Sequence, residues 1–531
     1  DAGAVGAVVP KSIWESRVGK LKSIGVNAIR MSHNPHSVEL MEVCDEMGVL
    51  VMDEFFDEWH IPKDKSIVYL GDNAAKGLDV ARGYSEHFDQ WAQRDLKDLI
   101  RRDFNHPSVI MWSIGNEIEW TFPVYTEAFK TLNPDIGNND GTPIFDPEQV
   151  RPVFDELTGG DRPLATVAKR LSGWVREVDT TRPVTCGSVR PSIAMVSGYG
   201  DAVDILGFNY RANCYDAAHE TYPDLKIIGS ENWGAYSEWK NVKERDFVSG
   251  MFAWTGFAYL GEAGPWPRKG LEISFFDYAG FKTPRGHFFE CLWKDDPKIY
   301  MVTSPAAESE YSWSEDEGWK FEMQMSKPPL WSALRKWEWY RVSETWNYED
   351  GQDVVVQCYT NCDEAELFLD GESLGRQARA DFDEDNIIKW LVPYAKGTLT
   401  VKGFIDGEPV DEYALHSTGK LARIELNADK ETLKADHVDV ALVDVKLYDE
   451  DGLQIKNLAT KITFDVAGAA SLLAVDNGWE KNVESHYQDH VTTHQGRALA
   501  IVQSTGESGS VTIKATCGDL ESETMTLTAE P

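Results

Sequence analysis

Hydrophobic and polar positions alternate along the first half of the chain in a regular order of helix and strand. Residues 10–25 carry apolar side chains at helical spacing, and residues 26–33 then form a mostly apolar run typical of a buried strand. Residues 37–48 repeat the helical spacing, and residues 49–55 repeat the strand. This order predicts a parallel sheet, because parallel neighbouring strands are joined by helical crossovers.

The same unit recurs down to about residue 257. An amphipathic stretch at 85–104 predicts a long helix, and the strand that follows it ends at Glu117. Seven strands are one fewer than a closed (β/α)8 TIM barrel contains. Because the chain opens on a loop and a helix, we expect the first strand upstream of Asp1, in a longer protein. The remaining strands are expected at 183–188, 205–210, 227–231 and 251–257.

Beyond residue 296 the helical spacing gives way to short alternating segments. Asp370-Gly371 and Asp406-Gly407 stand where hairpin turns are needed, and a second set of such segments begins near Leu421. The pattern predicts two immunoglobulin-like β-sandwiches after the barrel. The expected domains are a catalytic barrel at 1–295, a first sandwich at 296–417 and a second sandwich at 418–531.

A polar insertion rich in Gly, Pro and Asp occupies residues 119–161, directly after the strand that ends at Glu117. In an α/β barrel the loops after the strands line the active-site face. Long loops in compact domains commonly serve a function. We therefore expect the insertion to shape the subsite for the leaving group.

Two glutamates follow apolar strands of the same design. Ser108–Glu119 ends in Gly-Asn-Glu at Glu117, and Lys226–Gly234 carries Glu231 beside Trp233. A carboxyl group desolvated at a strand end keeps its proton more readily, and two such groups are what glycoside hydrolysis requires. Either one alone could equally be a surface residue, but the pair favours catalysis. Glu119 is the main rival of Glu117.

Composition narrows the classes of partner. Acidic residues outnumber basic ones 88 to 52, so nucleic acids and anionic membranes are unfavourable partners. No apolar run approaches the roughly 18 residues of a membrane span. The 19 tryptophans support carbohydrate binding, because indole faces stack on sugar rings. A periplasmic or secreted location is favoured over a cytoplasmic one, and a homo-oligomer remains open.

Linked motifs in the barrel resemble those of glycoside hydrolase family 2, which contains β-galactosidases, β-glucuronidases and β-mannosidases. The segments that carry the resemblance are Asn27–Pro35 (NAIRMSHNP), Val51–Glu54 (VMDE) and Asn105–Glu117 (NHPSVIMWSIGNE). The sandwiches are similar to the extra carboxyl-terminal domains of bacterial members, most closely at Tyr359–Leu374. The resemblance implies the barrel fold and a carbohydrate substrate.

The resemblance also implies roles for individual residues. It makes Glu117 the acid/base and Glu231 the nucleophile. The remaining implied site residues are Asn116 on the sugar 2-hydroxyl, Tyr210 as donor to Glu231, His33 on the glycone, Trp254 beneath the sugar ring, and Arg30, Asn209 and Trp233 as supporting groups. Arg30 could instead be an internal ion-pair partner, Trp254 could be ordinary core, and metal binding by His33 is the weaker alternative. Asp53 and Glu54 are expected to be structural acids.

One departure from the family pattern concerns the domains before the barrel. The sugar-binding jelly-roll and the first sandwich that usually precede the barrel are not in this sequence. Those domains usually complete the glycone pocket, so we expect amino-terminal domains of the same protein as partners.

These observations predict a retaining exo-acting β-glycosidase of oligo- or polysaccharides, with β-galactosidase first. A β-glucuronidase would be expected to carry an Asn-x-Lys clamp after the last barrel strand, whereas residues 265–274 offer only Arg268 and Lys269. Because these two cations could bind an anionic group, an acidic or sulfated sugar remains an alternative substrate. A non-catalytic carbohydrate-binding protein is the alternative from another class, and a barrel endoglucanase fits less well. No cofactor is expected, although a structural or activating divalent cation remains possible.

Overall fold

The computed structural model describes residues 2–63, 83–121, 128, 145–261, 266–271, 273–321 and 339–531. The chain divides into two compact units, each considered by itself. One combines Asp1–Gly25, Gly256–Pro328 and Glu338–Pro531, and the other combines Val26–Thr255 and Pro329–Trp337. The expected domain boundaries at 295 and 417 remain a prediction.

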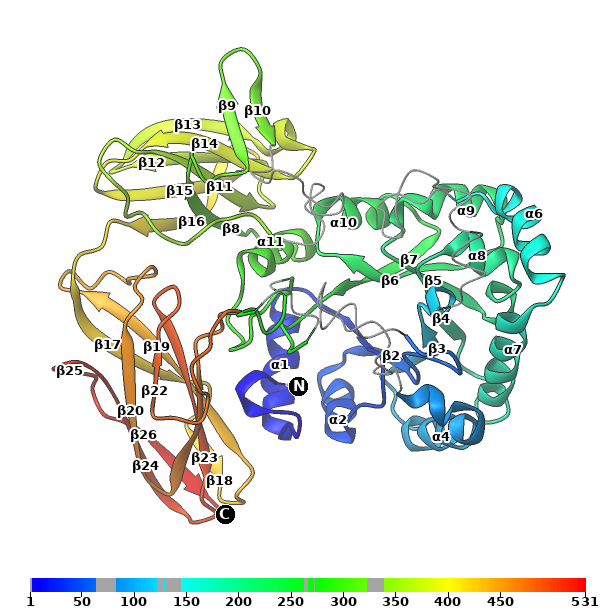
Figure 1. Cartoon of the computed structure of the whole chain (residues 1–531). Helices are drawn as coiled ribbons and strands as arrows, with labels where there is room; N and C mark the ends of the chain where they lie inside the picture. The colour runs from blue at the N-terminus through cyan, green and yellow to red at the C-terminus, as the bar shows by residue number, and fades with distance from the viewer. Residues whose placement is uncertain are drawn as a thin grey trace. The chain divides into compact units, whose positions relative to one another are not determined.

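The second unit is built on a parallel sheet of seven strands in sequential order, which confirms the seven strands predicted (Figure 1). The sheet curls so that β7 approaches β1, giving a nearly closed barrel. Among the described residues β1 and β7 are its edge strands. The strands are β1 (Ala28–Met31), β2 (Leu50–Glu54), β3 (Val109–Asn116), β4 (Val184–Ser188), β5 (Ile205–Asn209), β6 (Ile227–Trp233) and β7 (Val248–Trp254).

Local signals set the limits of the barrel helices. Ser37 caps α2 by accepting a hydrogen bond from the amide of Leu40, and Gly48 ends that helix in a left-handed conformation. Asp146 caps α6 in the same way. The helices of this unit are α2 (Val38–Met47), α4 (Phe88–Asp103), α6 (Pro147–Thr158), α7 (Pro163–Arg176), α8 (Pro191–Val196), α9 (Tyr215–Thr221) and α10 (Tyr236–Lys243).

The barrel interior is filled by side chains from alternate positions of the strands. Met52, Met111 and Ile228 form a buried cluster inside it. Because side chains alternate along a strand, Glu54 on β2 shares the inner face with Met52. The middle of the interior is therefore a packed apolar core, and the polar groups of the site described below lie toward the carboxyl ends of the strands.

The first unit contains two β-sandwiches, as predicted. The first pairs the sheet β14-β11-β8 with the sheet β13-β12-β15-β16, and the second pairs β17-β19-β23-β21 with β18-β26-β24-β20-β22. Figure 1 shows the first in yellow-green and the second in orange and red. Their strands are β8 (Ile299–Pro305), β11 (Asp353–Thr360), β12 (Glu364–Leu369), β13 (Glu372–Ala378), β14 (Ile387–Pro393), β15 (Thr398–Ile405), β16 (Glu408–His416), β17 (Leu421–Ala428), β18 (Thr432–Lys434), β19 (Val440–Asp449), β20 (Lys461–Gly468), β21 (Ala470–Asp476), β22 (His490–Thr492), β23 (Arg497–Ser504), β24 (Gly509–Cys517) and β26 (Met525–Glu530).

The two Asp-Gly pairs form hairpin turns where they were expected. Asp370 and Gly371 have φ values of 48° and 86°, and Asp406 and Gly407 have values of 52° and 84°. Positive φ at both central residues is what a tight turn between twisted antiparallel strands requires. A further hairpin, β9 (Tyr311–Ser314) with β10 (Gly318–Phe321), belongs to the same unit, as does the short β25 (Leu520–Glu521) beside β24.

The second sandwich packs against segments from elsewhere in the first unit. The start of the chain, up to Ile13 in α1 (Lys11–Ser23), and Ala279 join one buried apolar cluster with Leu442, Leu499 and Ile501. Helix α11 (Pro284–Trp293) follows Ala279 in the chain. The second sandwich is therefore bound to residues that the sequence analysis assigned to the barrel domain.

The predicted insertion at 119–161 falls largely outside the described residues. Residues 122–127 and 129–144 are not described, and the last part of the insertion forms α6. No helix in the described part of the chain is both long and apolar enough to cross a membrane.

Candidate active site

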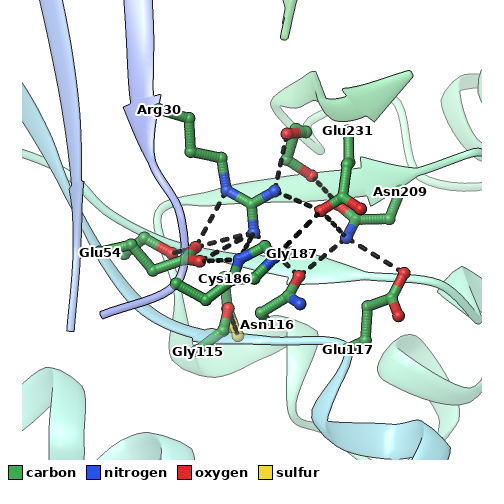
Figure 2. Close-up of polar contacts among 12 residues, drawn as sticks. Arg30, Glu54, Gly115, Asn116, Glu117, Cys186, Gly187, Asn209 and Glu231 are labelled. Atoms are coloured by element: carbon green, nitrogen blue, oxygen red, sulfur yellow. Dashed lines mark hydrogen bonds and ion pairs between the residues drawn. The ribbon is translucent and has the colours of Figure 1, made fainter. Parts of the chain in front are cut away.

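Polar side chains from five barrel strands converge at their carboxyl ends (Figure 2). Arg30 comes from β1, Glu54 from β2, Asn116 from the end of β3, Asn209 from the end of β5 and Glu231 from β6. Glu117 follows Asn116 directly. Hydrogen bonds and ion pairs connect all six of these side chains, so the site is a preformed hydrogen-bonded network.

Asn209 links the two predicted catalytic carboxylates. Its Nδ2 donates to Glu231 Oε2 at 3.0 Å and to Glu117 Oε1 at 3.3 Å, as Figure 2 shows. Its Oδ1 accepts a 2.6 Å hydrogen bond from Ser230, which fixes the orientation of the amide. Glu117 and Glu231 therefore lie at the same end of the barrel, within two hydrogen-bond lengths of each other, or roughly 6 Å.

Arg30 is the cation at the centre of the network. Its Nη1 lies 2.6 Å from Glu231 Oε2, its Nη2 lies 2.8 Å from Glu54 Oε2, and Nη2 also donates to Asn116 Oδ1 at 2.9 Å. Burial opposes the charge of Arg30, but Glu54 and Glu231 outweigh it and raise the pKa of the guanidinium. The contacts of Arg30 agree with both interpretations given above: it is a buried ion-pair partner, and it also contacts Glu231.

Tyr210 and Trp233 complete the surroundings of Glu231. The Tyr210 hydroxyl donates to Glu231 Oε1 at 2.5 Å, the contact that the family resemblance implied. The ring of Tyr210 packs against Trp233, with centroids 4.8 Å apart. Together with Arg30 and Asn209, Tyr210 supplies the donors that stabilise an ionised Glu231.

His33 and Trp254 stack on one another beside the network. Their ring centroids are 5.1 Å apart and the planes are nearly parallel, at 8°. His33 Nδ1 lies 2.6 Å from Glu54 Oε1, and its Nε2 lies 3.9 Å from Glu231 Oε2. The aromatic platform predicted at Trp254 therefore adjoins the carboxylate pair.

The backbone is strained at two of these positions. Glu117 and Tyr210 have φ values of 47° and 57°, in the left-handed region that residues other than glycine seldom adopt. Such conformations cost about 1–3 kcal/mol each and tend to occur at functional sites. Both residues directly follow a barrel strand, so the strain turns their side chains out of the strand direction.

Burial distinguishes Glu117 from an ordinary carboxylic acid. Desolvation, followed by the negative charge of Glu231, raises the pKa of Glu117 to about 7. Lys63 and the hydrogen bond from Asn209 act in the opposite direction. A carboxyl group with this pKa holds a proton near neutral pH and can give it to a leaving oxygen.

Glu119 occupies a different environment. It is fully buried, and its Oε1 accepts hydrogen bonds from the Ser188 hydroxyl and the Arg190 amide, each at 2.7 Å. These contacts tie Glu119 to β4 and the segment after it. Glu117, rather than Glu119, is the glutamate bridged to Glu231.

Two groups at the site were not identified from the sequence as members of it. Glu54 was predicted to be a structural acid, yet it contacts both Arg30 and His33, and these charges overcome the effect of burial and lower its pKa to about 2. Asp57 and Lys63, in the segment after β2, form a 2.6 Å ion pair, and Asp57 also accepts from Asn116 at 3.3 Å. Inward alternation along β2 could have indicated Glu54, but no local pattern pairs Asp57 with Lys63.

A possible cation site lies on another part of the barrel. His36, Asp53 and Asp103 offer ligand atoms that all lie within 4.8 Å of one another. Asp103 already forms a 2.7 Å ion pair with Arg102. Asp53 precedes Glu54 on β2 and faces the opposite side of the strand, so this group is separate from the carboxylate pair. The expectation that no cofactor is needed remains a prediction.

Family models match most of the chain. The model described as "Glycosyl hydrolases family 2, TIM barrel domain" matches residues 2–249, and "Glycoside hydrolase family 2 C-terminal domain 5" matches residues 424–526. Between them, a domain of unknown function matches residues 351–411.

Individual relatives agree with these matches. The Beta-galactosidase BoGH2A of Bacteroides ovatus is 28% identical, and the alignment covers 100% of this chain and 60% of that protein. A putative beta-glucuronidase of Formosa agariphila is 26% identical over 90% of this chain and 42% of its own length. A crystal structure of a glycosyl hydrolase family 2 member from Bacteroides cellulosilyticus superposes with a TM-score of 0.80 at 29% identity, covering 100% of this chain and 61% of that one. The chain thus spans about half the length of the curated relatives it matches.

Proposed function

Because the chain belongs to glycoside hydrolase family 2, we propose that it forms the catalytic part of a retaining, exo-acting β-glycosidase. In this proposal Glu231 attacks the anomeric carbon while Glu117 protonates the departing oxygen. Glu117 then deprotonates a water molecule that releases the sugar from Glu231. The single observation that carries the proposal is the amide of Asn209, which donates to both carboxylates.

The spacing of the two carboxylates supports retention over inversion. Retaining enzymes hold their carboxyl groups about 5–5.5 Å apart, whereas inverting enzymes need about 6.5–9.5 Å to admit a water molecule. The shared Asn209 donor brings one oxygen of Glu117 and one of Glu231 to within roughly 6 Å of each other, and this close approach favours the shorter, retaining separation.

The charges around the pair support a neutral glycone, and we propose β-galactosides as the first substrate class. Two cations, Arg30 and Lys63, face the carboxylates of Glu54, Asp57 and Glu231. An additional carboxylate or sulfate on the glycone would enter a site that is already negative. The Bacteroides ovatus relative is named a β-galactosidase, which agrees with this choice.

Arg268 and Lys269, the cations that kept an acidic or sulfated sugar as an alternative substrate, each pair with a carboxylate. Arg268 Nη2 lies 2.9 Å from Glu480 Oε2, and Lys269 Nζ lies 3.8 Å from Asp476 Oδ1, all within the first unit. Both cations are therefore already paired with carboxylates of their own unit. The name of the Formosa agariphila relative keeps β-glucuronidase as the second candidate.

The proposal is tested with a panel of 4-nitrophenyl β-glycosides, including the galactoside and the glucuronide. We expect the galactoside to give the highest kcat/KM, and proton NMR of the reaction to show the β-anomer of the released sugar first. A first-formed α-anomer would contradict retention. Sugar binding without hydrolysis of any panel member would instead favour a non-catalytic carbohydrate-binding protein.

A further inference from the structure

The Asp57–Lys63 ion pair differs from the other ion pairs of the site in its exposure. The side chains of Arg30 and Glu54 are 3% and 0% exposed, whereas those of Lys63 and Asp57 are 19% and 26% exposed. The first pair therefore holds the network together from within. The second pair has polar atoms that a molecule entering the site can reach.

The pair is connected directly to the sugar-binding groups. Asn116 Oδ1 accepts from both Arg30 and Asn209, which directs its Nδ2 toward Asp57 Oδ1 at 3.3 Å. The charges of Glu117 and Glu231 act on Lys63 and, with Asp57, overcome its burial to raise the pKa of the ammonium. Asp57 and Lys63 thus lie on the Asn116 side of the carboxylate pair.

Asp57 has bonding capacity left for a ligand. In the described part of the chain its two side-chain donors, Lys63 Nζ and Asn116 Nδ2, both bind Oδ1. Within the described residues, Oδ2 accepts no hydrogen bond from protein. The ammonium of Lys63 has three donors, and only the one to Asp57 is used by a protein side chain in the described part of the chain.

A buried carboxylate holds the backbone at Lys63 in place. Glu58 is 4% exposed, and its carboxylate accepts from the Lys63 amide at 2.9 Å and from the Ser85 amide at 3.3 Å. The position of Lys63 is therefore set by a buried acid rather than by its own side chain. A recognition group needs such support, because a shift of about 1 Å weakens a hydrogen bond strongly.

We propose that Asp57 and Lys63 form a specificity site for the glycone 3-hydroxyl, next to the 2-hydroxyl assigned to Asn116. Vicinal hydroxyl oxygens lie about one hydrogen-bond length apart, which matches the spacing of Asn116 Nδ2 and the Asp57 carboxylate. Asp57 Oδ2 accepts from the 3-hydroxyl, and Lys63 Nζ donates to the same oxygen. The inference rests on the proposed function, because it places a sugar over Glu231.

The test compares kcat/KM for the nitrophenyl glycoside most active in the panel with its 3-deoxy and 6-deoxy analogues. The enzymes are the wild type, Asp57→Ala, Lys63→Met and the charge-balanced Asp57→Asn/Lys63→Met variant. We expect the wild type to lose about 10²-fold on removal of the 3-hydroxyl, since hydrogen bonds to charged groups are the strong ones. In each of the three variants, removing the 3-hydroxyl should lower kcat/KM by less than about threefold. The ratio of kcat/KM for the parent glycoside to that for its 6-deoxy analogue should be the same in all four enzymes.

Controls separate the possible failures. Asp155→Ala breaks an ion pair with Arg162 on the barrel surface and should leave both deoxy ratios unchanged. Circular dichroism and Tm verify folding, and the double variant covers the case in which a single uncompensated charge unfolds the protein. An equal 3-deoxy penalty in wild type and folded variants overturns the inference but leaves the glycosidase proposal standing. A shifted pH profile with an unchanged 3-deoxy ratio also overturns it, and hydrolysis of no panel member overturns both.

Discussion

At the scale of single residues, the central chemical problem is to keep one carboxyl group protonated beside another that is ionised. Glu231 has Arg30, Asn209 and Tyr210 as donors, which stabilise its charged form. Among the described residues, the Glu117 carboxyl group receives one side-chain hydrogen bond, of 3.3 Å from Asn209, and it is desolvated. The different surroundings of the two glutamates are therefore consistent with the different roles proposed for them.

The pH dependence of hydrolysis should report the titration of Glu117. Because its pKa is raised to about 7, the proton-donating form predominates below that pH and is lost above it. We expect kcat/KM for a substrate with a poor leaving group to fall about tenfold per pH unit above roughly pH 7. A flat profile up to pH 9 would contradict the assignment of Glu117 as the acid.

Replacing Glu117 by Ala should separate substrates by their leaving groups. Proton donation by a positioned group contributes typically about 10²–10⁴-fold, and an aryl oxide that leaves readily does not need it. We expect a loss in that range for alkyl glycosides and little loss in the first step for dinitrophenyl glycosides. Glu119→Gln is the control, because Glu119 contacts Ser188 and Arg190 and should show no dependence on the leaving group.

At the scale of secondary-structure elements, the site depends on how closely β4 approaches its neighbours. Gly187 on β4 lies beneath the polar network, and a β-carbon there would stand 3.0 Å from Asn209 Oδ1 and 3.1 Å from Arg30 Nη2. These distances are shorter than ordinary van der Waals contacts. The absence of a side chain on β4 therefore gives the two groups room to reach Glu231.

Gly187→Ala should consequently lower activity more than stability. The added methyl displaces Asn209 and Arg30 by a few tenths of an ångström, and we expect kcat to fall by at least about tenfold with the fold retained. Gly173→Ala in α7 is the matched control, since nothing lies within 4 Å of its β-carbon and alanine favours a helix by about 0.5–1 kcal/mol. Steady-state kinetics with thermal melts measure both effects, and unchanged kcat in Gly187→Ala would contradict the account.

The elements themselves were largely predictable, and the polar contacts between them only in part. Continuous apolar runs and helical spacing located the barrel strands and helices, and the structure shows α2 capped by Ser37 and ended by Gly48. Glu117 and Glu231 could be found because each follows an apolar strand. The Asp57–Lys63 pair could not be found in this way, because both residues lie in an irregular segment. The path of such a segment leaves no periodic pattern in the sequence.

At the scale of the whole molecule, the carboxyl-terminal part of the chain forms one compact unit with segments from its start and middle. The apolar cluster that joins residues 2–13, Ala279 and the second sandwich consists of contacts hundreds of positions apart. Sequence periodicity reports which face of a strand is apolar, but not which distant segment covers it. This is why the packing of these segments was not anticipated.

A buried carboxylate joins the two sandwiches within that unit. Glu344 accepts a hydrogen bond from Tyr300 in the first sandwich and pairs with Lys456 at 2.7 Å and Arg497 at 3.2 Å in the second. Burial would raise its pKa, but Arg497 and Lys456 lower it to about 2. The stabilisation it provides is therefore present above its unfolded pKa of about 4.3 and is lost as the pH falls toward 2.

Glu344→Gln should lower Tm clearly at pH 7 and much less at pH 3, because the wild type itself loses the stabilising charge in acid. Breaking one partner of a buried ion pair costs about 3–5 kcal/mol. Glu425→Gln is the control, since its pair with Arg423 is exposed and worth at most about 1 kcal/mol. Equal shifts in Tm for the two variants at pH 7 would show that Glu344 does not join the sandwiches as described.

The central proposal is that Glu231 forms a covalent bond with the anomeric carbon of the sugar during turnover. The most direct measurement is trapping with the 2-deoxy-2-fluoro analogue of the best panel glycoside, which slows both chemical steps, followed by peptide mass spectrometry. The account predicts a protein heavier by one fluorosugar, with the label on Glu231 and none in Glu231→Gln. A label on Glu117, or normal turnover by Glu231→Gln, would contradict it.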